Sequence, residues 1–453
     1  MCSSDLAPFA EAMQALKDKP AHREVDRRFV YIDPRPDRVG GMRRTDPGRP
    51  GFFSVIFGSL SSIPREQPVR DNLEVLARQS SQTSRLRGIV EALRPEIEQS
   101  VEKLFGLTLF LNRPTVNRLA AWRAKAQQAA AERAGFAYHA YAQVKVAGIV
   151  DGLAQLIHAA APQLMLPSPE PIAQALTRHL ASNGLSSLIA PRGGATPGTV
   201  AFLTAHDLPF RIRRLRLLAR RLADSWDSGD EVSEIARERA RTAVYGALAL
   251  YFNRETRECL GPGFANLAAS VFQDPGAVLD SIDTSRSLRE IDMQVDAMLA
   301  AALAEMPSPL RRRMLFAYLG FPFYDTVTLP LLRGEGLNEF DPVNVDRISP
   351  EDANSIRTGG APECLRGVEF YNFGAFFSRV YRENDYLWGR LHGAERMIDL
   401  VASALPEGTV LGADVMAGFK RDAFLAILDE EEGRLMADPG LVAGIRAEVL
   451  GAG

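Results

Sequence analysis

Phe210-Arg-Ile-Arg-Arg-Leu-Arg-Leu-Leu-Ala-Arg-Arg-Leu-Ala-Asp-Ser-Trp226 is an arginine-rich segment in which an apolar residue recurs every three or four positions. This spacing places Ile212, Leu215, Leu218 and Leu222 on one face of an α-helix. From about residue 69 onward, long stretches rich in Ala, Leu, Arg and Glu repeat the same kind of pattern. No fixed period relates these stretches to one another, which argues against a helical repeat array. The sequence therefore predicts a mainly α fold, made of irregular multi-helix domains.

Composition narrows the class of protein. The chain has 453 residues, of which 46% are hydrophobic and 24% charged, as in an average soluble globular protein of two or three domains. A formal net charge of −3 creates no general field that would attract nucleic acid, so we expect no nucleic-acid partner. The three cysteines, Cys2, Cys259 and Cys364, lie far apart without C-x-x-C spacing. This favours neither a disulfide framework nor a zinc site, and it fits a reducing, cytoplasmic compartment.

The first 50 residues have a different sequence pattern from the helical pattern of the rest of the chain. Residues 7–17 have helical spacing, and Phe29-Val-Tyr-Ile32 is a short β-prone run that ends at Asp33-Pro34. Residues 35–50 are dense in Pro, Gly, Arg and Asp, and we interpret them as a hinge loop. One strand cannot satisfy its own backbone groups, so the run needs sheet partners. Because the following chain is helical in pattern, we expect those partners to lie outside this sequence.

Breaks in the helical pattern divide the chain further. The clearest are Pro191–Gly198, Gly261–Gly263 and the stretch Gly320–Gly367, each rich in Pro and Gly. We therefore predict three segments: residues 1–66 with the strand and the hinge, a helical domain over residues 67–335, and a C-terminal helical subdomain over residues 336–453 packed on it.

The arginine-rich helix has two interpretations. As a basic amphipathic helix it could lie on an anionic membrane, with Arg213, Arg216 and Arg220 facing the lipid head groups. As a domain helix it would instead bury its apolar stripe in the core and pair its arginines with acids such as Glu231 and Glu234. Its internal position in the chain favours the domain helix.

A second segment, Tyr381–Arg396, collects polar residues on one helical stripe. Steps of three or four residues align Tyr381, Asp385, Trp388, His392 and Glu395. Gly389 and Gly393, four apart, would open a groove for close packing. The stripe is either a polar interaction face or a buried network that holds the helix to its neighbours, and we favour the network.

Catalytic and ligand-binding motifs are scarce. No G-x-S-x-G pentapeptide is present, and the nearest approach, Gly58-Ser-Leu-Ser-Ser62, lacks the second glycine. None of the six histidines belongs to an H-E-x-x-H pair, so we predict no metal site. The glycine-rich run 193–198 lacks the Lys-Ser/Thr ending of a phosphate-binding loop. We therefore assign no catalytic residue and no cofactor.

Several long strings resemble the patatin-related (patatin-like phospholipase) proteins of bacteria, whose α/β catalytic domain is followed by a long helical region. The resemblance extends over nearly the whole chain. The strings are Asp26–Pro34, Gly51–Phe53, Ile63–Asp71, Tyr318–Asp325, Leu331–Leu337, Asp346–Pro350 and Tyr381–Arg396.

This resemblance implies a function for the parent protein. It implies a lipid acyl hydrolase that cleaves esters with a Ser-Asp dyad, the serine in G-x-S-x-G and the aspartate in D-G-G or D-G-A. Neither motif is present here, and Asp151-Gly-Leu153 has the wrong third residue. Residues 7–34 would be the last helix and strand of the patatin sheet, a short remnant that precedes the helices.

The expected function is therefore that of a non-catalytic helical C-terminal part of such a hydrolase, with its catalytic N-terminal part missing from this chain. The resemblance implies the patatin catalytic domain as partner, and a cytoplasmic location, at most peripheral to a membrane. The alternative is a helical interaction module that binds a protein partner or an anionic membrane surface.

Overall fold

The computed structural model describes residues 25–33, 63–106, 114–191, 193–223, 232–334, 343–367, 378–405 and 411–451, with Ala12 and Ala15. For residues 63–80 it describes the backbone alone. Within these ranges the regular structure is almost entirely helical, which confirms the mainly α prediction. Apart from Ala12 and Ala15, which are helical, the predicted helix 7–17 lies outside the described residues, as does the hinge 35–50.

The chain divides in space into two units. The helical unit contains residues 14–25 and 81–340, and the terminal unit contains residues 1–13, 26–80 and 341–453. This division differs from the three predicted segments, because residues 26–80 group with the C-terminal part of the chain. The reason is a pairing between two strands that lie far apart in the sequence, given below.

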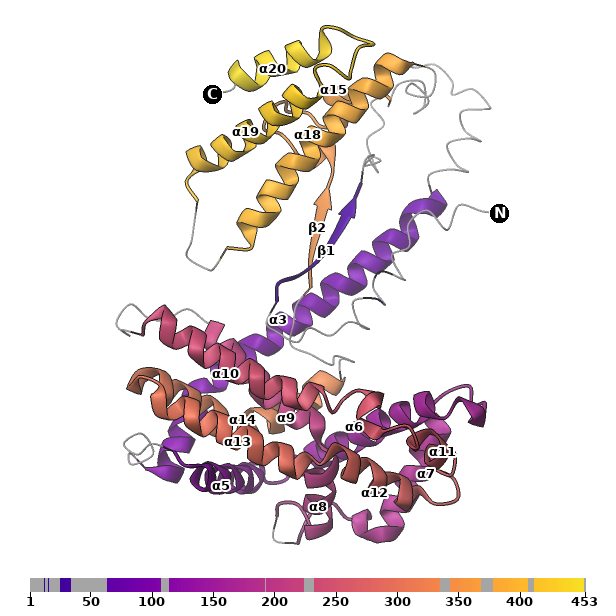
Figure 1. The fold of residues 1–453 in the computed structure, drawn as a ribbon, viewed down its shortest axis with the longest axis vertical. Helices are drawn as coiled ribbons and strands as arrows, with labels where there is room; N and C mark the ends of the chain where they lie inside the picture. The colour runs from indigo at the N-terminus through magenta and orange to yellow at the C-terminus, as the bar shows by residue number, and fades with distance from the viewer. Residues whose placement is uncertain are drawn as a thin grey trace. The chain divides into compact units, whose positions relative to one another are not determined.

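The helical unit is built from eleven named helices of the described chain, several of them visible around α9 in Figure 1. Their bounds are α3 (Ile63–Phe105, of which residues from 81 belong to this unit), α5 (Val116–Ala134), α6 (Ala137–Ala160), α7 (Glu170–Leu180), α8 (Pro197–His206), α9 (Leu208–Ala223), α10 (Glu234–Phe252), α11 (Phe264–Ala268), α12 (Pro275–Arg286), α13 (Leu288–Glu305) and α14 (Ser308–Gly334).

The arginine-rich segment forms α9, the central helix of this unit. Asp207 caps its N-terminus, because its Oδ1 accepts a 3.1 Å hydrogen bond from the backbone N–H of Phe210. The predicted apolar stripe is buried among α10, α13 and α14. The opposite face is covered too, since Phe210 and Leu217 pack in a second cluster with Phe321 of α14. A helix enclosed on both sides has no face left to lie on a membrane.

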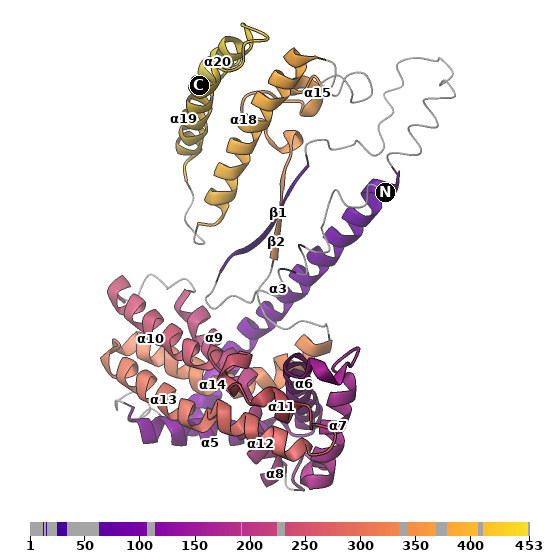
Figure 2. The ribbon, with the colours of Figure 1, turned by 45° about the vertical axis from the view of Figure 1, so that its right-hand side comes forward.

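A separate core lies among α6, α7, α11 and α12, which gather in one part of the helical unit (Figure 2). Its centre includes Ile157, Ile172 and Val278, each fully buried. The helix α12 was not predicted as an element of its own. Its start is marked by Asp274, whose Oδ1 accepts a hydrogen bond from the N–H of Ala277, followed by Pro275 at the first helical position.

The prediction that the helical pattern breaks at Gly320 was wrong. The helix α14 continues through Gly320, Pro322 and Pro330 to Gly334. Burial outweighs the local helix-breaking tendency, since residues 314–325 are all buried. At Gly320 a Cβ would meet Ile97 Cγ2 at 2.8 Å, so the glycine permits close packing against α3. Residues 308–332 also have the length and apolar composition of a membrane span, but 78% of the residues in their apolar 18-residue window are buried inside the protein, as in a core helix.

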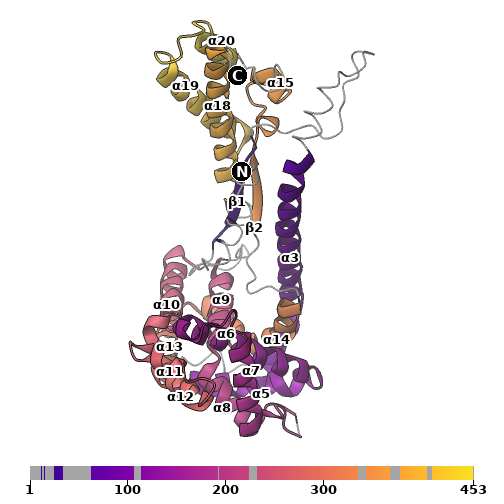
Figure 3. The ribbon, with the colours of Figure 1, turned by 90° about the vertical axis from the view of Figure 1, so that its right-hand side faces the viewer.

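The terminal unit contains the predicted strand, β1 (Arg27–Ile32), and the expectation that its partners lie outside the sequence was wrong. It pairs in parallel with β2 (Val343–Ile348), with Phe29 opposite Val345 (Figure 3). The second strand, Val-Asn-Val-Asp-Arg-Ile, falls in the segment that we had interpreted as a Pro/Gly-rich break. The Arg28 Nη1 atom reinforces the pairing with a 3.2 Å ion pair to Asp346 Oδ2.

Helices complete the terminal unit. They are α15 (Ala361–Cys364), α18 (Arg379–Ser403), α19 (Ala413–Glu431) and α20 (Leu441–Gly451). The core lies among the last three, where Leu387, Leu391 and Leu428 are fully buried. The helix α18 also contacts β2, so it connects the two-stranded sheet to this core.

Candidate functional site

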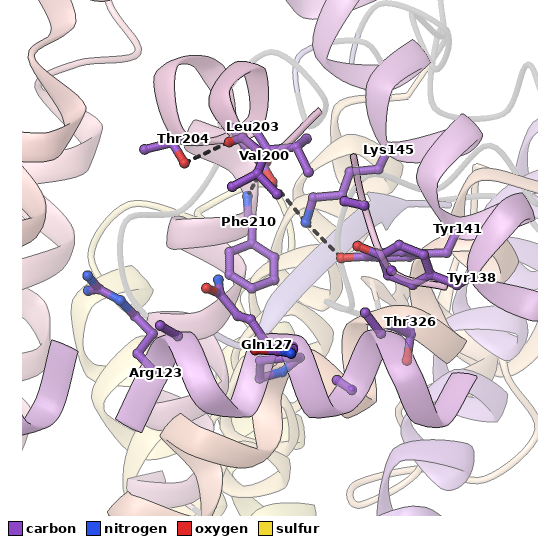
Figure 4. A pocket seen from close by; sticks show the side chains of 18 of the residues that line it. Arg123, Gln127, Tyr138, Tyr141, Lys145, Val200, Leu203, Thr204, Phe210 and Thr326 are labelled. Atoms are coloured by element: carbon purple, nitrogen blue, oxygen red, sulfur yellow. Dashed lines mark hydrogen bonds and ion pairs between the residues drawn. The ribbon is translucent and has the colours of Figure 1, made fainter. Parts of the chain in front are cut away.

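The helical unit contains a cavity of about 530 Å³ (Figure 4). That volume falls in the range of small-molecule binding sites. Side chains from α5, α6, α8, α9, α13 and α14 line the cavity, together with the loop at residues 193–195. Four of the lining residues come from α9 and its N-cap and are spaced as one helical face: Asp207, Phe210, Arg211 and Arg214, of which all but Phe210 are charged.

Small residues explain why this space is open. The helix α5 presents alanines to the cavity at helical spacing, among them Ala120, Ala124 and Ala131, which leave volume that larger side chains would fill. The rim includes exposed side chains of α5 and the loop residues Gly193 and Gly194. These glycines have φ of 89° and 76°, a conformation that other residues rarely adopt. The cavity thus has a polar rim that water can reach.

Lys145 of α6 lies at one end of the cavity, where Figure 4 shows its side chain reaching toward Tyr141. Its Nζ donates to Tyr141 Oη at 2.7 Å and lies 2.8 Å from Asp207 Oδ2 and 3.4 Å from Asp325 Oδ2. Nζ also lies 3.8 Å from the centre of the Phe210 ring. These three oxygens match the three donors of an ammonium group, so Lys145 is held as a structural cation.

Asp325 of α14 is the acid at the centre of this network. Burial raises the pKa of its carboxyl group, but the Arg213 guanidinium, Lys145 and the Tyr141 hydrogen bond outweigh burial and hold the pKa below its usual value. Arg213 approaches as a fork, with Nε 3.0 Å from Oδ1 and Nη2 3.1 Å from Oδ2. The carboxylate is therefore ionised and fully engaged.

A second ion pair joins α9 to α13. Arg211 Nε and Nη2 each lie 2.8 Å from an oxygen of Asp292 on α13. The remaining guanidinium donors reach backbone oxygens of Thr204 and Asp207. Tyr251 Oη donates to Asp292 at 2.7 Å. Burial raises the pKa of Asp292, but the hydrogen bond and charge of Arg211 lower it overall.

The third pair occupies the end of the cavity opposite Lys145 and Tyr141 in Figure 4. Arg123 Nη1 of α5 lies 2.8 Å from Asp296 Oδ1 and donates to Tyr318 Oη at 3.5 Å. Tyr318 Oη donates to the same Asp296 oxygen at 3.0 Å. Burial raises the pKa of Asp296, and Arg123 and Arg214 only partly offset that effect. Arg214 has its guanidinium carbon 4.6 Å from the centre of the Tyr318 ring.

This lining is suited to binding. Its charged groups are mostly paired in fixed geometry, and the residues of the described chain that line it include no serine, cysteine or histidine. The serine or cysteine nucleophile of a covalent hydrolase is therefore not among the described residues of this cavity. Alanines, Val200, Leu203 and Phe210 provide apolar surface between the charged ends.

The structure places the arginines of the predicted basic helix inside the helical unit. None of the six arginines of α9 is exposed. Arg213 binds Asp325, Arg216 lies 5.6 Å from the Phe252 ring centre, and Arg220 is half-buried. Of the two expected acids, Glu234 was wrong, because it pairs with Arg237 and Arg241 of its own helix. The other, Glu231, lies outside the described residues, so its pairing stays a prediction.

The predicted polar stripe of α18 contains two kinds of side chain. Its carboxylates hold a neighbouring segment, and its rings lie in the core. Asp385 accepts hydrogen bonds from the backbone N–H groups of Arg366 and Gly367, at 2.7 and 2.8 Å. Glu395 accepts from the N–H groups of Asn354 and Ser355, each at 3.2 Å. Tyr381, at the first turn, is half-buried. The two carboxylates thus fasten the segment 349–367 to α18, a structural role.

Trp388 and His392 lie between these acids, in the core. Their rings are 5.2 Å apart, and Trp388 is 1% exposed. Burial lowers the pKa of His392, and neither ring nitrogen has a hydrogen-bond partner in the part of the chain that the structure describes. The predicted groove at Gly389 and Gly393 was wrong, because a Cβ at either position would meet nothing within 4 Å.

Sequence reasoning missed the cavity residues. A signal was present, since Asp325 stands alone in the apolar run 314–332 and Lys145 in the apolar run 140–150. A charge in the middle of a buried helix needs a partner, so each of them pointed to the other. Among the described residues, no cluster of three or more His, Cys, Asp or Glu side chains is placed to hold a metal ion.

Comparison with known proteins finds one family. Residues 277–426, a third of the chain, match a family described as "Protein of unknown function (DUF3376)". The match spans the strings Tyr318–Asp325, Leu331–Leu337, Asp346–Pro350 and Tyr381–Arg396. No curated protein and no solved structure matches the chain.

Proposed function

We propose that this chain is the non-catalytic helical part of a patatin-like lipid acyl hydrolase. The proposal rests on the long strings quoted above, from which the resemblance arises. One structural observation supports a non-catalytic role: the acids of the cavity and of the α18 stripe are committed to ion pairs and backbone hydrogen bonds. Acids held in this way act as supports for the fold.

The partner in this proposal is a patatin-type catalytic domain, and the location is the cytoplasm. The alternative, a helical interaction module that binds a protein partner or an anionic membrane surface, drew on the arginine-rich helix. Since no arginine of α9 is exposed, that helix gives the alternative no support.

An ester-hydrolysis assay tests the proposal. The purified chain is incubated with p-nitrophenyl butyrate and with phosphatidylcholine vesicles, beside the same chain extended by its upstream coding sequence. We expect release of product by the extended protein and none by the chain alone above a mock purification. Hydrolysis by the chain alone, eluting with it on gel filtration, would contradict the non-catalytic role.

A second outcome would contradict the parent activity. If the extended protein carries the serine and aspartate motifs but releases neither fatty acid nor p-nitrophenol, the lipid acyl hydrolase assignment is wrong.

A further inference from the structure

The cavity leaves one cation without a counter-charge. Four of the five basic residues in and beside its lining each form an ion pair of 2.8–2.9 Å with a different one of the four buried or half-buried acids there. The pairs are Lys145 with Asp207, Arg211 with Asp292, Arg213 with Asp325 and Arg123 with Asp296. The fifth, Arg214, lines the cavity and forms no ion pair or hydrogen bond with any described residue.

Arg214 is also the most deeply buried of the five relative to its size. It is 2% exposed, and its Nε is buried without a hydrogen-bond partner among the residues that the structure describes. Its contacts are the rings of Tyr318 and Phe210, 4.6 and 5.7 Å from the guanidinium carbon. Aromatic rings stabilise a cation without neutralising it. An arginine stays charged at any physiological pH, so this position carries a permanent buried positive charge.

The nearby acid forms no ion pair with Arg214 among the described residues. Asp296, whose pKa Arg214 lowers, already accepts from Arg123 and from the Tyr318 hydroxyl. Tyr318 also brings two cations together, since its hydroxyl contacts Arg123 and its ring contacts Arg214. Two guanidinium groups therefore converge at one end of the cavity, and one of them is unpaired.

We propose that the cavity binds a small organic monocarboxylate, whose carboxylate group pairs with Arg214 at the end shared with Arg123. A planar guanidinium suits the planar carboxylate. A single negative charge balances the single unpaired cation, whereas a dianion would leave an uncompensated charge. Glu132, the remaining acid of the lining, is exposed at the rim and already accepts a hydrogen bond from Gln128, so solvent screens it.

The rest of the cavity indicates an organic ligand. Alanines of α5, together with Val200, Leu203 and Phe210, form apolar walls between the arginine end and the Lys145 end. The volume of about 530 Å³ accommodates a short acyl chain or an aromatic ring beside the carboxylate. This inference does not depend on the proposed hydrolase relationship.

Binding is tested first with a panel of matched ligands. Hexanoate and benzoate are compared with hexanamide, benzamide and inorganic phosphate by titration calorimetry and by the shift in melting temperature. We expect at least one carboxylate to bind and raise the melting temperature, with its amide at least about tenfold weaker. The proposal is overturned if neither carboxylate binds, if an amide binds as well as its carboxylate, or if phosphate binds more tightly.

A pair of variants then locates the site. Arg214→Met removes the charge and keeps an apolar side chain, and Arg216→Met is the matched control on the same helix, away from the cavity. We expect Arg214→Met to weaken carboxylate binding by about tenfold or more and Arg216→Met to leave it within about twofold. Unchanged binding by Arg214→Met would overturn the proposal. If Arg214→Met does not fold, Arg214→Lys, which keeps the charge but loses the fork, must weaken binding in its place.

Discussion

The hydroxyl group of Tyr141 on α6 donates a 2.7 Å hydrogen bond to Asp325 on α14, and both side chains are buried. The same hydroxyl accepts a 2.7 Å hydrogen bond from Lys145. One phenol oxygen therefore joins a buried cation to a buried anion and connects two helices of the cavity wall. Burial and the adjacent carboxylates hold the pKa of Tyr141 well above its usual value, so it remains a donor.

Replacing Tyr141 by phenylalanine should destabilise the helical unit. The change keeps the ring but removes one hydrogen bond from the Asp325 carboxylate and one from the Lys145 ammonium. The free energy of unfolding should fall by about 1–3 kcal/mol. Denaturant unfolding followed by circular dichroism measures the loss. The control is Tyr138→Phe, on the same helix and cavity wall, which should change stability by less than about 0.5 kcal/mol. Equal losses for the two variants would contradict this role.

His206 should make the helical unit sensitive to mild acid. Burial, with the nearby Arg286 and Arg211, lowers the pKa of His206 to about 4, from 6.5 in the unfolded chain. Between these values the unfolded chain binds a proton that the folded protein does not, so stability falls as pH falls. From pH 7 to pH 5 this group should reduce the free energy of unfolding by about 2 kcal/mol.

The variant His206→Leu tests the pH effect. We expect a flatter stability profile between pH 7 and pH 5, a range above the ordinary pKa values of Asp and Glu side chains. A profile as steep as that of the parent would assign the acid sensitivity to other groups, among them His392 of the terminal unit, whose pKa burial also lowers.

Asp385 should stabilise the terminal unit through the backbone. Its substitution by alanine leaves the N–H groups of Arg366 and Gly367 without their carboxylate, which should cost about 1–3 kcal/mol. Hydrogen exchange at these two amides should accelerate in the variant. The exposed Asp422 provides the control, and its alanine variant should stay within about 0.5 kcal/mol of the parent. Unchanged exchange at both amides would contradict the anchoring role.

The sequence predicted the helices where one apolar face was clear and failed where burial overrode local preference. The stripe of Ile212, Leu215, Leu218 and Leu222 was readable because its period is that of a helix. The continuation of α14 through Pro322 was not, since only tertiary packing makes it favourable. The pairing of β1 with β2 was not predicted either. Arg28 and Asp346, which contact each other across these strands, are 318 residues apart, and no local sequence pattern indicates such a pairing.

The residues of the candidate sites were likewise predictable only in part. Spacing correctly placed Asp385, Trp388, His392 and Glu395 on one helix, but it could not show that the acids bind backbone amides of residues 354–367. The sequence favoured a domain helix with paired arginines at α9, but it did not identify the partners Asp292 and Asp325, because these come from distant helices. Ion pairs between elements far apart in sequence become visible only in the folded protein.

Comparing Arg213 with Arg214 tests the central claim, that one arginine of α9 is paired inside the cavity network and its neighbour is not. The measurement is the free energy of unfolding of Arg213→Met and Arg214→Met, without added ligand. The account predicts a loss of about 3 kcal/mol for Arg213→Met, because Asp325 loses its guanidinium, and no loss for Arg214→Met, because an unpaired buried charge is removed. Equal destabilisation by the two variants would contradict it.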